Sequence, residues 1–220
     1  MATSEHPLPL PAISRLPRGR HRLSREDVHQ SQRQRLLLAM LNAVHQRGYR
    51  QTTVADVVAL AAVSRSSFYE HFTDKEDCFV AAYGFAMDYV FARTQAGADT
   101  ALGGTWQERA RADMTAHLEV LASEPAMAVT LHVEVLAAGP VALEHRAQML
   151  GLLAARFARL NDLAHASDPA LPTIPPAAYA LYTGGLDELI RDRLRTGKPE
   201  DLRELPGPVL EATFALFGAS

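Results

Sequence analysis

The spacing of apolar residues is the feature that most limits how this chain can fold. From Arg25 to about Gly218, apolar residues recur mostly at the three-to-four-residue spacing of an α-helix with one buried face. We find no convincing alternation of apolar and polar residues between hairpin turns, which strands would show. The sequence therefore predicts an all-α fold of about nine helices.

Capping residues, glycines and prolines divide this region into segments. Gly48 is suited to end a first helix, and Thr53, Ser64 and Asp74 are suited to begin the next three. The proline-rich stretch 167–176 can only be a loop. The expected helices are about 26–47, 53–61, 64–71, 74–96, 105–122, 125–138, 141–165, 176–195 and 206–217.

Charge is distributed unevenly along the chain. Residues 1–75 carry ten Arg and one Lys against six acidic residues, a net charge of +5, whereas residues 76–220 have a net charge of -8. The basic part suits a polyanion, and the acidic part would be repelled by one. We expect a flexible basic arm at 1–24, a nucleic-acid-binding domain at 25–75, and an acidic partner or sensor domain at 76–220. Charge alone fits a disordered basic tail on an enzyme about as well.

Composition excludes several other classes of protein. The single cysteine, Cys78, rules out an internal disulfide framework and a multi-cysteine zinc site. Its acidic neighbours are expected to raise its pKa and to blunt its reactivity. No uncharged apolar run reaches the roughly 18 residues of a membrane span, and prolines and arginines interrupt any signal peptide. We expect a cytoplasmic protein that has no membrane partner and no metal or cofactor.

Residues 52–79 are the most informative stretch. A short helix, a tight turn at Ala61-Ala62-Val63 and a second helix begun by a serine form a helix-turn-helix arrangement. Four apolar residues are expected to lock the two helices together, namely Val57, Val58, Val63 and Phe68. The residues left to face outward are Ser64, Arg65, Ser66, Ser67, Tyr69 and His71. Short hydroxyl side chains and an arginine at the start of the second helix suit a DNA major groove.

Residues 36–83 resemble the TetR family of one-component bacterial regulators. The family pattern is matched at Gly48-Tyr49, Thr52-Thr53-Val54, Ser64, Phe68-Tyr69, His71-Phe72 and Lys75-Glu76. The chain departs from it at Ala62, where the family usually has glycine, and at Ser66-Ser67, where Gly-Thr is frequent. Alanine is expected to add slight strain to a left-handed turn.

The resemblance implies a set of DNA contacts within this region. Contacts with phosphates are implied for Thr53, Tyr69, His71 and Lys75, and approaches to base edges for Arg65, Ser66 and Ser67. Tyr69 could instead be a core aromatic, although Phe68 and Phe72 are already available for the core. A capping or packing role for His71 fits nearly as well.

The arm offers a further set of candidate contacts. Three arginines of the arm, Arg18, Arg20 and Arg22, could enter the adjacent minor groove. A solvated tail without DNA contacts is about as consistent with the sequence.

The resemblance also implies that residues 76–220 form a ligand-binding and dimerisation domain. Candidate pocket residues on the middle helices are Trp106, Met114, His117, Leu118, Leu121, Met127, Leu131, His132, Val135, Met149, Leu153, Phe157 and Tyr179. A stripe of this kind is more often plain core. Candidate dimer residues on the last two helices are Leu186, Leu189, Ile190, Phe214 and Phe217. Gly184-Gly185 would suit a close helix crossing, either across a dimer or inside the pocket.

Together these features predict a homodimeric transcriptional regulator with a DNA operator as its partner. We expect a repressor that a small, largely apolar effector releases from DNA. The sequence has no phosphate loop, HExxH motif or nucleophile elbow, so we do not expect an enzyme. Two alternatives stay open: the C-terminal domain could be an enzyme, with a convergent polar cluster, or a protein-binding adaptor, with a filled core and an exposed apolar patch.

Overall fold

The computed structural model describes residues 25–218, and every regular element in that range is a helix. The α-helices are α1 Arg25–Arg47, α2 Val54–Ala61, α3 Arg65–His71, α4 Lys75–Ala98, α5 Trp106–Ser123, α6 Pro125–His132, α7 Pro140–Ser167, α8 Pro176–Thr196 and α9 Pro206–Leu216. Short 3-10 helices are η1 Asp99–Ala101, η2 Glu134–Ala137 and η3 Pro199–Glu204. The predicted all-α fold is confirmed for the described part of the chain.

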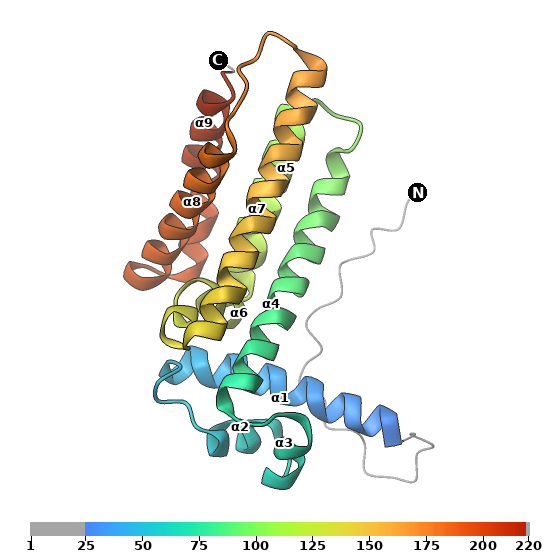
Figure 1. Ribbon diagram of the computed structural model, residues 1–220, viewed down its shortest axis with the longest axis vertical. Helices are drawn as coiled ribbons and strands as arrows, with labels where there is room; N and C mark the ends of the chain where they lie inside the picture. Colours follow the sequence, from blue (N-terminus) through green and yellow to red (C-terminus); the bar gives the residue numbers. More distant parts are fainter. Residues whose placement is uncertain (1–24, 219–220) are drawn as a thin grey trace.

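The helices form two groups that lie across each other (Figure 1). α1 crosses the lower end of the molecule, with α2 and α3 beneath it, and the long helices α4, α5, α7, α8 and α9 stand above. α4 connects the groups, because its first turns lie against α1 and its length packs along α5 and α7. α4 is therefore packed against helices of both groups.

Side-chain caps define the starts of the helices that the sequence predicted most clearly. Thr53 and Thr105 each form a capping box with an acidic residue three positions later. Ser64 and Asp74 each accept a hydrogen bond from the backbone N–H three residues on. These bonds satisfy N–H groups that have no partner within the first helical turn. The local sequence therefore determines where these helices begin.

The helix expected at 125–138 is shorter than predicted. α6 ends at His132, and η2 follows it as a 3-10 turn. Arg191 Nε donates to the carbonyl oxygen of His132 at 2.9 Å, so a residue of α8 satisfies the end of α6. The segment expected only to separate the last two helices contains η3. Both differences lie where the structure of a segment depends on distant parts of the chain.

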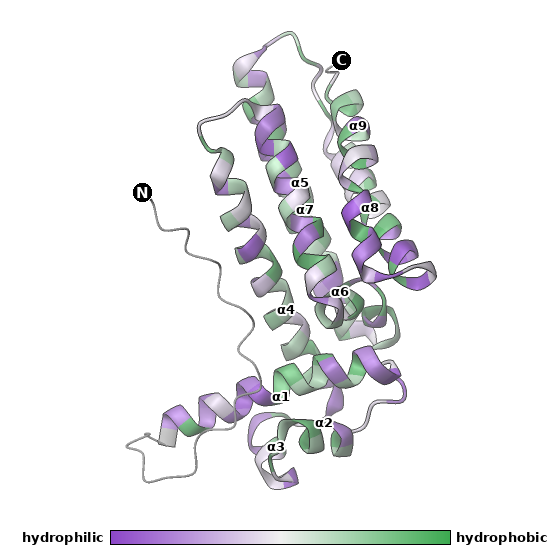
Figure 2. Cartoon of the chain, turned by 180° about the vertical axis from the view of Figure 1, so that it is seen from behind, coloured by the Kyte–Doolittle hydropathy of each residue, from purple (hydrophilic) through white to green (hydrophobic). Residues whose placement is uncertain are grey.

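One apolar core runs through both groups of helices. Residues 36–41 of α1 are all buried, because α2, α3, α4 and α6 surround this part of the helix. The core continues through Phe79 and Tyr83 of α4 to Met114 and Leu118 of α5. Figure 2 shows the contrast along α1, whose first half is hydrophilic and whose second half is apolar up to a hydrophilic last turn. The lower group therefore shares its core with the upper group.

The turn between α2 and α3 has the strained conformation that the sequence predicted. Ala62 has φ of 52°, and it is the one non-glycine residue with positive φ among residues 25–218. Arg35 Nη1 of α1 donates to the carbonyl oxygens of Ala61 at 3.1 Å and Ala62 at 3.4 Å. These two bonds stabilise the turn from outside the helix pair.

Cys78 is fully buried on the inner face of α4. Burial, and secondarily the charge of Asp77, raise the pKa of its thiol to about 12. The expected direction is confirmed, although burial has a larger effect than the acidic neighbours. No helix within residues 25–218 is long and apolar enough to cross a membrane.

Candidate functional site

α3 presents a polar outer face on an apolar inner one. Phe68 and Phe72 are buried beneath the helix, and the ring of Phe68 meets that of Tyr69 edge-on at 5.3 Å. Tyr69 itself is 49% exposed, so the structure does not support the alternative that it is a core aromatic. The side chain of Tyr69 is therefore free to contact a ligand outside the protein.

Hydroxyl groups gather at the first turn of α3. Ser64 Oγ accepts from the backbone N–H of Ser67 at 3.0 Å, and it lies 2.8 Å from Ser66 Oγ and 3.0 Å from Ser67 Oγ. Arg65 Nη2 donates to Tyr69 Oη at 3.4 Å, and its guanidinium lies 5.7 Å from the centre of the Tyr69 ring. This face combines small hydroxyl donors with a cation at a helix N-terminus, as recognition of an anionic duplex requires.

Thr53 and His71 are more engaged within the protein than the resemblance implies. The hydroxyl of Thr53 donates to Asp56 Oδ2 at 2.7 Å and caps α2, and these bonds lower the pKa of Asp56. The ring of His71 packs against that of His29 with centroids 4.0 Å apart and ring planes tilted by 43°, and neither of its ring nitrogens has a hydrogen-bond partner. Burial, then the charges of His29 and Arg33, lower the pKa of His71. These contacts favour the packing role for His71.

Lys75 forms part of a junction between the two groups of helices. Its ammonium group donates to the carbonyl oxygen of Tyr49 at 3.0 Å and lies 4.1 Å from the centre of the Tyr49 ring. The backbone N–H of Tyr49 donates to Glu134 Oε2 at 2.7 Å. A lysine ammonium has three N–H groups, so the phosphate contact expected for Lys75 stays compatible with this bond.

Glu134 was not predicted as a functional residue. It belongs to η2 and follows α6, yet its carboxylate binds the backbone just beyond the end of α1. Its partner Tyr49 is 85 residues away in sequence, and no local pattern signals such a pair. The predicted arm contacts Arg18, Arg20 and Arg22 lie outside the described residues.

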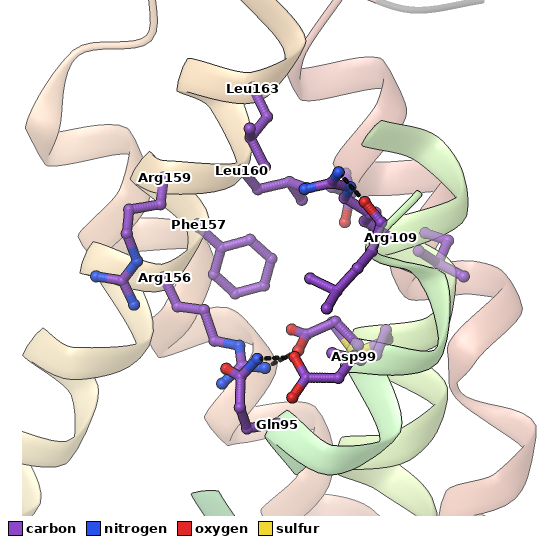
Figure 3. Close-up of a pocket in the computed structure, with 15 residues that line it drawn as sticks. Gln95, Asp99, Arg109, Arg156, Phe157, Arg159, Leu160 and Leu163 are labelled. Atoms are coloured by element: carbon purple, nitrogen blue, oxygen red, sulfur yellow. Dashed lines mark hydrogen bonds and ion pairs between the residues drawn. The ribbon is translucent and has the colours of Figure 1, made fainter. Parts of the chain in front are cut away.

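A cavity of about 170 Å³ lies in the upper group of helices, between α4, α5, α7 and α9. Figure 3 shows the ring of Phe157 at its centre, Arg156 and Arg159 on the α7 side and Arg109 on the α5 side. Apolar side chains form much of the remaining wall, including Met114 and Leu160. The cavity is thus apolar inside and charged at its border.

Two small cavities of about 10 Å³ each continue inward from this one. We call the three cavities outer, middle and inner. The middle cavity shares Met114 and Phe157 with the outer one, and the inner cavity shares His117 and Leu153 with the middle one. The structure therefore contains a row of spaces that side chains separate.

Seven of the thirteen candidate pocket residues line these cavities. They are Met114, His117, Leu131, His132, Met149, Leu153 and Phe157. The remaining candidates line none of the three: Leu118, Leu121, Met127 and Val135 lie in the core, Trp106 packs on Phe217, and Tyr179 donates to Asn161. For these six the plain-core alternative fits the structure better.

Charged residues at the cavity border were missed by the sequence reasoning. Arg109 and Asp113 lie four residues apart on the face of α5 that also bears Met114, so they belong to the same stripe as the apolar lining. Arg156 forms an ion pair with Asp113 across the cavity. Attention to charges that interrupt an apolar stripe would have found them.

A buried ionic network lies beside the inner cavity. His132 Nδ1 donates to Asp187 Oδ1 at 2.7 Å, and Arg146 and Arg191 bind Asp187 Oδ2. Burial alone would raise the pKa of Asp187, but His132, Arg191 and Arg146 together hold it well below its ordinary value. This network joins α6, α7 and α8 at the wall of the inner cavity.

The predicted dimer residues require a correction. Leu186, Ile190 and Phe217 are buried within the protomer, and Phe214 is half-buried beside Trp106, with ring centroids 5.5 Å apart. The apolar residues of α8 and α9 mostly face α5, α6 and α7, which sequence periodicity cannot distinguish from a partner. Of the five, Leu189 is clearly exposed, at 51%.

α8 nevertheless has an exposed apolar strip. Leu181 is 77% exposed, and a shallow groove lined by Leu189, Gly185 and Val209 follows the surface between α8 and α9. A Cβ atom added at Gly184 or Gly185 would meet no atom within 4 Å, so these glycines do not serve a close crossing inside the protomer. This surface is called the α8 strip below.

The paired short helices α2 and α3, with their buried inner face and polar outer face, define a helix-turn-helix DNA-binding regulator. Residues 36–82 match the sequence model described as bacterial regulatory proteins, tetR family. The helix-turn-helix region of this chain is thus similar to that of the tetR family.

Solved structures with the same fold include two regulators named FadR, one of them described as a fatty acid degradation regulator, and a ketosteroid regulator. FadR from Bacillus halodurans is 18% identical, with a TM-score of 0.69 over 83% of this chain and 94% of that chain. FadR from Bacillus subtilis, in complex with stearoyl-CoA, is 18% identical, with a TM-score of 0.71 over 81% of this chain and 96% of that chain. The ketosteroid regulator KstR2 of Mycobacterium tuberculosis is 20% identical, with a TM-score of 0.60 over 83% and 93%.

Proposed function

We propose that this regulator inserts α3 into the major groove of an operator and represses transcription until an effector occupies its cavities. The observation that carries the DNA-binding role is the outer face of α3, where Arg65, Ser66, Ser67 and Tyr69 project from a helix fixed by buried Phe68. Base edges would be read by Arg65 and the serines, and a phosphate would be bound by Tyr69. The protein would act in the cytoplasm, where its operator lies.

Two copies of the chain would bind the operator as a homodimer. One helix-turn-helix reads few base pairs, and a two-fold axis places two recognition helices in successive major grooves. The α8 strip supports this assembly, since exposed Leu181 and Leu189 flank two glycines whose Cβ positions are open. The seam would therefore consist of exposed residues rather than the buried Leu186 and Ile190.

The row of cavities supports an effector-binding role for the upper group of helices. A mostly apolar interior suits a small, largely apolar ligand. The same cavities argue against an adaptor, which requires a filled core. The stearoyl-CoA complex of the Bacillus subtilis regulator further supports an effector site in this fold.

Release from DNA would follow a shift between two conformations. An effector between α4, α5 and α7 favours a wider arrangement of these helices, and α4 carries the movement to α1. The bond from Tyr49 N–H to Glu134 would carry it from the other side of the junction. The distance between the two recognition helices would then no longer match the spacing of successive major grooves, and the dimer would bind the operator less tightly.

DNA binding is tested with operators selected from a random duplex library, by fluorescence anisotropy at fixed salt. We expect Arg65→Ala to cost about 1–3 kcal/mol and to relax base preference. Tyr69→Ala should weaken binding to all sequences alike. Arg111→Ala, which removes a cation from α5, is the matched control. Equal affinities for all four proteins would contradict the assignment of α3.

Dimerisation is tested by sedimentation of wild-type protein and of Leu189→Glu. Because Leu189 is exposed, the glutamate should leave the protomer folded and convert dimers to monomers. Leu152→Glu on α7, also half-exposed, is the control that should stay dimeric. A folded dimer of Leu189→Glu would place the seam elsewhere.

A further inference from the structure

The three cavities form a path along α7. Asp113, Met114, Arg156 and Phe157 line both the outer and the middle cavity. Phe91, His117 and Leu153 line both the middle and the inner cavity. From Arg159 to Met149, α7 descends ten residues, which is about 15 Å at roughly 1.5 Å per residue. Side chains alone interrupt this path.

The size of the cavities favours a thin ligand. The outer cavity, at about 170 Å³, is close to the roughly 150 Å³ of a cavity that holds benzene. The middle and inner cavities, at about 10 Å³ each, hold no more than one water-sized group. Met114 is unbranched and can adopt other rotamers, so rotation of Met114 and Phe157 would admit an extended chain but not a bulky ring system.

The mouth of the path favours an acid. Arg109, Arg156 and Arg159 border the outer cavity against Asp99 and Asp113, an excess of one positive charge. Two of the arginines are engaged, because Arg156 pairs with Asp113 and Arg109 donates to the carbonyl oxygens of Leu102 and Gly104.

Arg159 differs from these two arginines. It is exposed, and the structure shows no hydrogen bond or ion pair for it among residues 25–218. In Figure 3 it extends along the α7 side of the opening. The charge of Arg159 opposes the burial that raises the pKa of Asp113, but no hydrogen bond within residues 25–218 occupies its guanidinium. A ligand carboxylate at the mouth would therefore meet a cation whose N–H groups are not engaged.

The inner end of the path favours a hydroxyl group. His117 is 7% exposed and His132 is 1% exposed, both line the inner cavity, and the Nε2 atom of each has no hydrogen-bond partner. Burial, then the charges of His132 and Arg156, lower the pKa of His117 to about 3, so its ring is neutral near pH 7. His132 donates from Nδ1 to Asp187, so Nε2 is the ring nitrogen that remains for a ligand.

We propose that the effector is an elongated amphipathic acid whose carboxylate binds Arg159 and whose far end carries a hydroxyl group bound by His117 and His132. This inference rests on the proposed function of the cavities as the effector site. A hydrocarbon terminus would leave both buried nitrogens unsatisfied, whereas a hydroxyl group donates to one and can accept from the other. The chemical class is thus an ω-hydroxylated fatty acid or a molecule of the same polarity pattern.

The test is titration calorimetry of the full chain without DNA, using laurate, ω-hydroxylaurate, dodecylamine and octanoate below their micelle concentrations. We expect ω-hydroxylaurate to bind on the order of tenfold more tightly than laurate, and laurate more tightly than dodecylamine or octanoate. Equal binding of laurate and dodecylamine would overturn the acid, and equal binding of laurate and ω-hydroxylaurate would overturn the hydroxyl group.

Variants locate the two ends of the ligand. Arg159→Gln should weaken laurate several-fold, whereas Arg50→Gln, an equal loss of charge on an exposed residue near the end of α1, should not. His132→Phe should abolish the preference for ω-hydroxylaurate, and His132→Gln should retain part of it. Unchanged preferences in all three cavity variants would contradict the proposed orientation.

Operator binding is measured separately, so that the two proposals can fail independently. A protein that binds its selected operator but does not distinguish these four probes retains the proposed regulatory function and refutes this ligand class. A protein that ranks the probes as expected but binds no operator retains the ligand class and refutes regulation of DNA binding.

Discussion

The α2–α3 unit and the row of cavities differ in how completely their interiors are packed. In the α2–α3 unit, capping side chains satisfy the helix starts, Phe68 fills the interior, and Arg35 stabilises the turn. Around the cavities, His117 and His132 each keep an unpaired buried nitrogen. The α2–α3 unit has a filled interior, although the ring nitrogens of His71 are unpaired there too, whereas the cavity region keeps open space beside its unpaired nitrogens.

This contrast indicates whether the ordering of each region precedes binding or depends on the bound ligand. A DNA-reading surface must be rigid before it meets DNA, because ordering it on binding would reduce its affinity. An effector site can remain incompletely packed, since the ligand supplies the missing contacts and thereby shifts the conformational equilibrium. The following predictions test whether the two regions differ in this way.

The largest expected difference is between two buried phenylalanines. Phe68→Ala should lower the free energy of unfolding by about 3–5 kcal/mol, because it empties a filled interior. Phe157→Ala should cost at least about 1 kcal/mol less, since its ring already borders empty space. Urea unfolding of both variants makes the measurement. Equal losses would show that the cavity wall is packed as tightly as the α2–α3 unit.

Glu134→Ala tests the junction between the two regions. It should lower the free energy of unfolding by about 1.5–3 kcal/mol, because it removes a hydrogen bond to a charged group. It should also reduce the fall in operator affinity that saturating effector causes. Glu144→Ala, on α7, is the control. A normal effector response in Glu134→Ala would exclude this bond from the coupling.

His117 predicts a pH dependence that belongs to the cavity region. Its pKa is lowered to about 3 in the folded protein, whereas the ordinary pKa of about 6.5 applies to the unfolded chain. Between pH 6.5 and pH 3, therefore, the unfolded chain binds a proton that the folded protein does not. Stability is therefore highest above pH about 6.5 and falls as the pH decreases, by about 2 kcal/mol at pH 5 for this group. His117→Phe should flatten the dependence by that amount. An unchanged pH profile in chemical unfolding would refute the neutral buried ring.

Ala62→Gly tests the strain in the left-handed turn of the α2–α3 unit. Glycine adopts the left-handed conformation of this turn without steric cost, so the free energy of unfolding should rise by about 0.5–1 kcal/mol. Ala59→Gly within α2 is expected to destabilise and serves as the control. A loss of stability in Ala62→Gly would mean that the turn is not strained.

Local sequence signals predicted the fold well where local bonds determine it. The starts at Thr53, Ser64 and Asp74 follow from side chains that bind backbone groups three residues away. The left-handed turn at Ala62 followed from comparison with a short motif. These features depend on neighbours that the sequence displays side by side.

Long-range pairs were not predictable in the same way. Tyr49 and Glu134 are 85 residues apart, and His132 and Asp187 are 55 residues apart. The apolar faces of α8 and α9 were assigned to a partner chain, yet Leu186 and Ile190 lie in the protomer core. Helical periodicity identifies a buried face but not the element that covers it.

The shared core has a consequence for recombination between regulators. Six successive residues of α1, 36–41, are covered by α4 and α6 as well as by α2 and α3. A chimera joined at residue 75 would therefore place foreign side chains against half of α1, even if every DNA-contacting residue were kept. A segment that could be exchanged between regulators would have to include the first turns of α4 and η2, because both pack against α1 or its end. We therefore expect that a new DNA specificity is better introduced by substitutions on the outer face of α3 alone.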